Sequence, residues 1–269
     1  MTRGVRDGGV MSATGFAQVL TVAATSTFIV TIDGPAGTGK STVAHRLAKR
    51  LGLEFLDTGA MYRAAALAAL QRGIDPSDGP RVAELVRGME LHFDWSCDPP
   101  ELYADGVAVG DRIRTPEVTR AVTPVASNPL VRAAMVHAQR AIAHRHRRLV
   151  TEGRDQGSVV FPDADVRIYL DARPEVRARR RVDQLRTKGI ETTEAEVLAQ
   201  ILERDRMDES RKDGPLVRPA GADIVDTSFI DIDDVIDRLE AVVRERAGAR
   251  LDGRGPDPSR AAGSTGAQP

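Results

Sequence analysis

Residues 34–41, with the sequence GPAGTGKS, have the types and spacing of a loop that binds nucleotide phosphates. Glycines let successive backbone N–H groups turn toward one phosphate, and a helix beginning after the loop adds its positive dipole end. Lys40 is placed to reach the β- and γ-phosphates, and the Ser41 hydroxyl to ligate Mg²⁺. We therefore predict a site for a nucleoside triphosphate and Mg²⁺. Its residues are Gly34, Pro35, Ala36, Gly37, Thr38, Gly39, Lys40, Ser41 and Thr42.

Several arginines stand at the edges of predicted elements, where they suit a second phosphate. Arg63 follows the second predicted strand, and Arg154 follows a strand that ends at Gly153. Transfer of a phosphoryl group to another phosphate needs cations rather than a base, because the attacking oxygen is already ionised. The spacing i, i+4, i+7 predicts one shared helical face for a third set, Arg204, Asp208 and Arg211. By spacing alone, that set equally fits a solvated helix face with salt bridges.

Short apolar runs alternate with helical stretches between residues 28 and 247. This alternation is typical of a parallel sheet with helices on both faces, so we predict an α/β fold. The predicted strands are Phe28–Ile32, Leu53–Leu56, Leu149–Thr151, Val166–Leu170 and Asp223–Val225. The predicted helices are 40–51, 61–71, 129–146, 173–188, 192–206 and 232–246.

Residues 88–115 depart from this alternation and predict a small antiparallel insertion of two or three strands, because turn sequences separate short alternating runs. We expect one domain over residues 27–248. Residues 1–26 have no clear period, and we expect a disordered extension in which Met11 is an alternative start. Residues 249–269 are rich in Gly, Pro, Ser and Ala and predict a disordered tail.

Composition excludes several classes of protein. Lys and Arg number 38 against 39 Asp and Glu, a balance that argues against a polybasic nucleic-acid binder. Aromatic residues make up 4% of the chain, too few for a single-strand binder that stacks bases. Cys97 is the single cysteine, so no internal disulfide forms, and no run of about 18 apolar residues exists. We expect a cytoplasmic monomer with neither nucleic acid nor membrane as a partner.

A bound triphosphate is compatible with several reactions. A GTPase recognises guanine with an N-K-x-D segment, and the sequence contains none. Larger motor ATPases need more chain and a strand that ends in a catalytic carboxylate. Asp171 stands at such a position, but one aspartate at a strand end is weak evidence for that class. A small kinase is the class that the residues favour.

Four segments resemble the bacterial cytidylate kinases, a family of P-loop nucleoside monophosphate kinases. The segments are IDGPAGTGKST at 32–42, LDTGAMYRA at 56–64, TEGRDQGSVVFPDA at 151–164 and ERDRMDESRKDGPL at 203–216. IRTPEV at 113–118 is similar to part of the enlarged monophosphate-binding region of this family. The resemblance implies a five-stranded kinase core, that region at about 60–128 and a short lid at about 204–216. It also implies transfer of the γ-phosphoryl group of ATP to CMP or dCMP.

The resemblance also implies roles for individual residues. The acceptor phosphate is bound by Thr58, Arg63 and Arg154, and Tyr62 also binds the substrate. Cytosine is recognised by Arg132 and Asp155, with Thr123 beside them. Arg204 and Asp208 contact the ribose, and Arg211 belongs to the lid. The predicted catalytic residues are Lys40, Arg154, Arg204 and Arg211.

The base assignment agrees with the chemistry of cytosine. A carboxylate such as Asp155 accepts from the exocyclic amine, while the Arg132 guanidinium donates to N3 or O2. Uracil reverses this polarity and leaves a buried charge unpaired, so we expect cytosine to be preferred strongly. Two alternatives remain at this point: a P-loop kinase for another monophosphate (UMP or AMP) or a small metabolite, and a regulatory nucleotide-binding module without catalysis.

Overall fold

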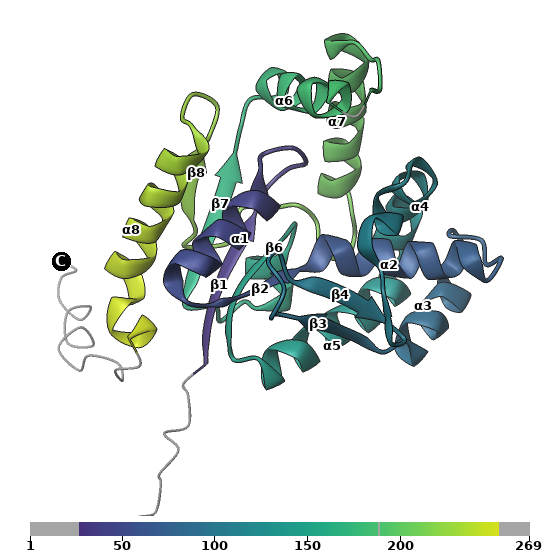
Figure 1. Ribbon diagram of the computed structural model, residues 1–269, viewed down its shortest axis with the longest axis horizontal. Coiled ribbons are helices and arrows are strands. Elements are labelled where there is room, and N and C mark those ends of the chain that lie inside the picture. Colours follow the sequence, from purple (N-terminus) through teal and green to yellow (C-terminus); the bar gives the residue numbers. More distant parts are fainter. Residues whose placement is uncertain (1–26, 188, 253–269) are drawn as a thin grey trace, which may run out of the picture.

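The computed structural model describes residues 27–187 and 189–252, and its centre is a five-stranded parallel sheet (Figure 1). The strands lie in the order β2-β6-β1-β7-β8, and every neighbouring pair is parallel. Their bounds are β1 Phe28–Asp33, β2 Glu54–Asp57, β6 Arg148–Gly153, β7 Val166–Asp171 and β8 Asp223–Asp226. The carboxyl ends of parallel strands meet at one edge of a sheet, which is where such folds bind ligands. The predicted α/β class and all five predicted strands are confirmed.

Helices cover both faces of this sheet and bury two separate cores. Phe28, Val30 and Ile32 point to the core formed with α1 (Lys40–Leu51) and α8 (Ile232–Leu251). Ile29 points to the opposite core, which is formed with helices between β2 and β6. Those helices are α2 (Thr58–Gln71), α3 (Gly79–Gly88), α4 (Pro116–Ser127) and α5 (Pro129–Arg145). The alternation of side chains along a strand places neighbouring apolar residues in different cores.

The predicted antiparallel insertion is present and has three strands. They are β3 (Leu91–Asp94), β4 (Glu101–Ala104) and β5 (Val107–Ala108), and they form a sheet of their own. A 3₁₀ turn (η1, Gly110–Arg114) leads from this sheet into α4. The helices α3 and α4 were not predicted. Thr115 caps α4 and Pro116 opens it, a start pattern that the sequence does contain.

The helices α6 (Pro174–Arg186) and α7 (Glu194–Glu209) form a hairpin that lies above the carboxyl edge of the sheet (Figure 1). Their contact is a small third core of Ala178, Val182, Val197 and Ile201, separate from the two sheet cores. A π-helical turn (η2, Gln156–Val160) follows β6. The apolar core of the hairpin is therefore separate from the apolar cores of the sheet.

Two predicted boundaries need correction. The last helix runs to Leu251 rather than 246, across a kink at Ala247, so residues 249–251 of the predicted tail are helical and Leu251 is buried. The second helix begins at Thr58 rather than 61, because the Asp57 carboxylate caps it by accepting from the Ala60 N–H. The extension at 1–26 and the tail from 253 lie outside the described residues. Among the described residues, no helix combines the length and apolar character needed to cross a bilayer.

Candidate active site

The phosphate loop connects β1 to α1 at the centre of the sheet's carboxyl edge. Gly34 has a positive φ of 148°, and a Cβ there would lie 2.0 Å from the Leu170 carbonyl oxygen of β7. Glycine is therefore required where the loop passes over the neighbouring strand. The Lys40 ammonium donates to the Pro35 carbonyl at 2.7 Å, and the Thr38 hydroxyl donates to the same oxygen at 3.2 Å. The loop thus folds back over its own lysine.

Charges of both signs surround the buried Lys40: Arg154 and Arg204 lower its pKa, and Glu152 and Asp208 raise it. Burial, together with the nearby Arg154 and Arg204, lowers the pKa of Lys40 to about 7. Burial and the same crowding by Arg154 lower the pKa of Arg204 to about 10. Neighbouring cations disfavour one another's charged form, and bound anions reverse that effect. Bound phosphates would therefore raise the pKa of Lys40 and stabilise its charged form.

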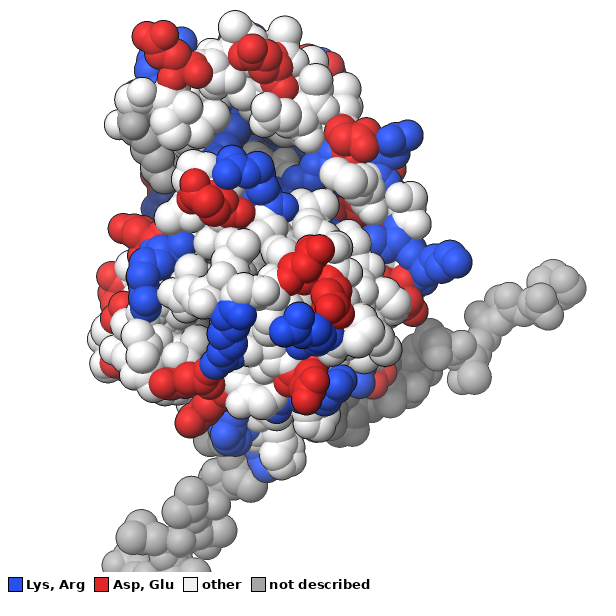
Figure 2. All heavy atoms as spheres, turned by 90° about the vertical axis from the view of Figure 1, so that its right-hand side faces the viewer, with Lys and Arg blue, Asp and Glu red and all other residues white. Residues whose placement is uncertain are grey.

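A second pocket lies beside the loop, beneath the α6–α7 hairpin, where Figure 2 shows lysine and arginine atoms crowding a hollow in the surface. Its cavity measures about 90 Å³. That volume is below the roughly 300–1,000 Å³ typical of ligand pockets, so a nucleotide enters only if the walls move. The lining residues are Thr58, Gly59, Tyr62, Arg63, Val122, Ala126, Arg132, Glu152, Gly153, Arg154, Asp155, Arg204, Asp208 and Arg211.

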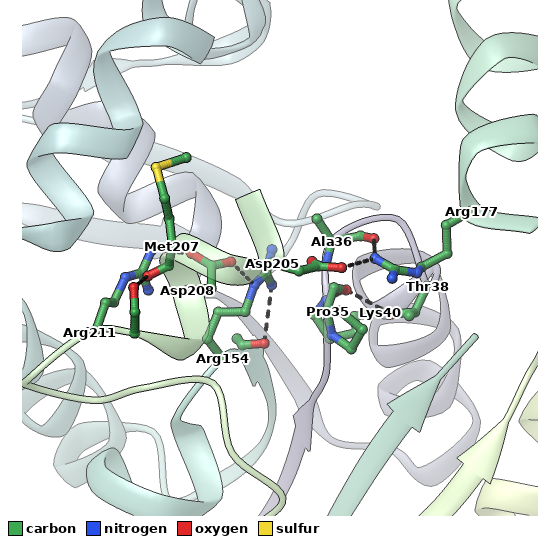
Figure 3. Close-up of polar contacts among 12 residues, drawn as sticks. Pro35, Ala36, Thr38, Lys40, Arg154, Arg177, Asp205, Met207, Asp208 and Arg211 are labelled. Atoms are coloured by element: carbon green, nitrogen blue, oxygen red, sulfur yellow. Dashed lines mark hydrogen bonds and ion pairs between the residues drawn. The ribbon is translucent and has the colours of Figure 1, made fainter. Parts of the chain in front are cut away.

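Asp208 is the ionic centre of this pocket. Its carboxylate accepts from the Arg154 Nε at 2.8 Å and forms a second ion pair with Arg211 (Figure 3). Burial by itself raises the pKa of Asp208, but Arg154, Arg211 and Arg204 outweigh it and hold that pKa below its ordinary value. A shared helical face with Arg211 was the wrong prediction, because α7 ends at Glu209. Arg211 folds back from the following turn and reaches Asp208 from there.

Arg132 and Asp155, the predicted cytosine-recognising residues, form a buried ion pair with each other. The backbone of Gly214 packs directly on this pair: a Cβ there would lie 1.8 Å from Arg132 Nη2 and 2.3 Å from Asp155 Oδ2. Any larger residue at 214 would collide with both side chains. A base that uses these two groups must therefore displace Gly214 and separate the pair.

The remaining predicted acceptor residues are distributed around the pocket. The Thr58 hydroxyl is buried and donates to the Glu152 carbonyl at 2.6 Å, while burial raises the pKa of Tyr62 to about 12 and keeps that phenol neutral. Arg63 donates to the Thr119 hydroxyl at 3.1 Å, which ties α2 to α4. Thr123 is half-buried on α4 and is not one of the residues that line the cavity, although Val122 and Ala126 of the same helix are.

Glu152, at the end of β6, was missed by the sequence analysis. Its carboxylate accepts from the Ser41 hydroxyl at 2.9 Å. Burial and the neighbouring Glu152 raise the pKa of Asp57 to about 7, so two carboxyl groups lie close together beside the phosphate loop. Asp171, considered above, instead accepts from the Ala172 N–H and pairs with Arg218 at 3.0 Å. The clue to Glu152 was its place directly after the predicted strand Leu149–Thr151, which neighbours β1 in the sheet.

Comparisons with known proteins identify the family. The family model described as cytidylate kinase matches residues 30–245. This chain belongs to the cytidylate kinase family. A cytidylate kinase of Rhodococcus jostii (strain RHA1) is 47% identical over 226 residues, covering 84% of this chain and 98% of that protein. A cytidylate kinase of Rhodococcus opacus (strain B4) is 48% identical over 225 residues, covering 83% and 98%. Family membership makes the chain an ATP-dependent nucleoside monophosphate kinase.

Proposed function

We propose that this chain of the cytidylate kinase family transfers the γ-phosphoryl group of ATP directly to CMP or dCMP, giving ADP and CDP or dCDP. The observation that supports this most is the adjacency of two anion sites. The phosphate loop with Lys40 lies on one side, and a pocket lined by five arginines lies on the other. In-line transfer needs donor and acceptor phosphates held against their mutual repulsion, and closely placed cations provide that.

The acceptor phosphate is bound by Thr58, Tyr62, Arg63 and Arg154 in this proposal. Arg154 has the largest effect of any cation on the pKa values of both Lys40 and Asp208, and it donates directly to Asp208. When phosphate oxygens take the place of the Asp208 carboxylate, Arg154 becomes free to bridge the two substrates. No general base is needed, since a monophosphate oxygen is already an anion at neutral pH.

Cytosine is bound between the parted Arg132 and Asp155 side chains. Each group keeps a partner of the right polarity, because Asp155 accepts from the amine and Arg132 donates to the ring. The ribose lies next to Arg204 and Asp208 on α7. Arg211 and the turn containing Gly214 then close over the substrates and exclude the water that would otherwise hydrolyse ATP.

Mg²⁺ fits beside the phosphate loop. Ser41 and Glu152 offer adjacent oxygens, and a Cβ on Gly59 would lie 3.3 Å from Asp57 Oδ1 and 3.6 Å from Glu152 Oε1, so glycine keeps this space open. Among the described residues no cage of three or more His, Cys, Asp or Glu side chains is formed. Mg²⁺ commonly binds through one or two carboxylates plus substrate phosphates, which suits this set. When bound, it would neutralise charge on the transferring phosphates.

The test is a coupled assay of ADP release with ATP and Mg²⁺ and four acceptors in parallel: CMP, dCMP, UMP and AMP. We expect fast turnover of CMP and dCMP, with UMP at least about 10²-fold slower in kcat/KM, because a polar site rejects a base of reversed polarity. Preference for UMP or AMP would contradict the base assignment. If none of the four acceptors increases the release of ADP, the proposed phosphoryl transfer is contradicted.

A further inference from the structure

The middle of the phosphate loop is held from outside by two side chains of the α6–α7 hairpin. Arg177 Nη1 donates to the Ala36 carbonyl at 2.9 Å, and Asp205 Oδ1 accepts from the Ala36 N–H at 3.4 Å (Figure 3). Both backbone groups of one loop residue are therefore bound by the hairpin. The N–H bond is long, and it is made by an amide that a phosphate group would otherwise engage.

The two side chains also bind each other. Arg177 and Asp205 form an ion pair of 2.6 Å, and both residues are buried, with 3% and 8% of their surface exposed. Arg177 Nε donates in addition to the Ala172 carbonyl at 2.9 Å. A buried charged pair is costly unless its hydrogen bonds are satisfied, and here they are satisfied by backbone atoms of the chain. The Arg177 guanidinium thus uses these contacts to position the phosphate loop rather than to bind a ligand.

Asp205 lies on α7, the helix that also carries the pocket residues Arg204 and Asp208. It stands next to Arg204 and three residues before Asp208, whose partners Arg154 and Arg211 line the acceptor pocket. In Figure 3 the labelled residues run from Arg211 and Asp208, through Asp205, to Ala36. Because the hairpin packs through its own small core, it can shift as one unit relative to the sheet.

From these contacts we propose that the Arg177–Asp205 pair couples occupancy of the acceptor pocket to the conformation of the phosphate loop. An acceptor phosphate takes Arg154 away from Asp208, and α7 shifts. The shift draws Asp205 from the Ala36 N–H, and Arg177 keeps the carboxylate neutralised while the freed amide turns to the donor phosphates. Acceptor binding therefore raises the affinity for ATP, and ATP raises the affinity for the acceptor by the same factor. The inference rests on the proposed function, since it takes CMP as the acceptor.

The test measures coupling rather than activity. We would determine the Kd of a non-hydrolysable ATP analogue with Mg²⁺ in the presence and absence of saturating CMP. In the unsubstituted protein we expect CMP to tighten the analogue at least about fivefold, the lower end of usual couplings. Asp205→Asn keeps the shape but loses the ion pair, and we expect its coupling factor to fall below about twofold. Because the variant weakens the Ala36 contact that each ligand must break, each ligand alone should bind it at least as tightly as it binds the unsubstituted protein.

Two further variants separate coupling from folding. Arg177→Lys keeps the charge but loses the planar fork, and it should reduce the coupling factor as Asp205→Asn does. Glu203→Gln changes an exposed carboxylate on the same helix, paired with Arg206 at 3.0 Å, and should retain the full factor. A merely structural role would lower the melting temperature and weaken both ligands without changing their ratio. That result, or full coupling in Asp205→Asn, overturns the inference. Absence of CMP turnover in the unsubstituted protein overturns both proposals.

Discussion

The phosphate loop and the acceptor pocket solve the same problem, the binding of phosphate, by different means. The loop is one continuous segment whose backbone does the binding, and its glycines permit the positive φ angles of Gly37 and Gly39. The pocket is a collection of side chains from α2, α4, α5, α7 and the turn after β6. Its charges are already paired with one another, chiefly at Asp208 and Asp155.

Because of this difference, the two sites should respond differently when their ligands bind. Glycines set most of the loop's backbone, and the hairpin holds its Ala36 N–H, so substitutions in the loop should change binding without altering selectivity. A pocket of paired charges must exchange its internal partners for those of the substrate, so it binds only ligands that replace every lost ion pair. Selectivity and closure should therefore depend on the pocket, whereas the titration of the donor site should depend on the loop.

The largest effect should follow removal of the cation between the two sites. Arg154→Met leaves the transferring group without its central cation, and we expect kcat/KM for CMP to fall by about 10³-fold. The Kd of an ATP analogue should change far less, because the backbone of the loop is intact. Steady-state kinetics and a binding titration measure the two quantities. A loss below tenfold would show that Arg204 or Arg211 has the role that we assign to Arg154.

Selectivity should be lost when the buried carboxylate of the pocket becomes an amide. Asp155→Asn offers uracil O4 a donor, and we expect the ratio of kcat/KM for CMP over UMP to fall by about 10²-fold. Asp163→Asn, the same change at an exposed position outside the pocket lining, serves as the control. Parallel assays with the two acceptors give the ratio. An unchanged ratio in Asp155→Asn would move base recognition to other residues.

The donor site should respond to pH in a way that the pocket does not. The pKa of Lys40 is about 7 in the protein alone, and donor phosphates favour the charged form, so binding above pH 7 requires uptake of a proton. Between pH 6 and pH 8 we expect affinity for a Mg²⁺-bound ATP analogue to fall about tenfold. Calorimetry in buffers of different ionisation enthalpy should detect about one proton taken up at pH 8. Lys40→Met should lack this uptake, and its persistence would assign it to the nucleotide.

The smallest effect is expected at Thr123. Thr123→Val removes a hydroxyl that lies outside the lining of the cavity, and we expect kcat/KM for CMP and for UMP to change by about twofold or less. The same parallel assays measure it. A loss of CMP turnover greater than tenfold, without a matching loss for UMP, would show that the Thr123 hydroxyl contacts the base when the pocket opens.

Sequence reasoning was accurate where structure depends on local patterns. Every strand of the main sheet was found from its apolar run, and the phosphate loop from glycines at fixed offsets, because turns and strands are encoded by neighbouring residues. It missed α4, whose capping residue Thr115 was interpreted as the end of the β insertion. Sequence reasoning also extended the helical face to Arg211. No change in the spacing of the residues marks Ser210, the cap at which α7 ends.

The sequence by itself determined the fold class, the family and the place of the phosphate loop, since each depends on residue types at short, fixed spacings. Only the tertiary structure decided which charges meet. The pairs Arg132–Asp155 and Arg177–Asp205 join residues 23 and 28 positions apart, and Glu152 reaches Ser41 across 111 positions. Ion pairs between distant segments depend on how helices pack on the sheet, and charged residues in a sequence do not specify their partners. The coupling proposed for α7 could therefore be inferred only from the folded chain.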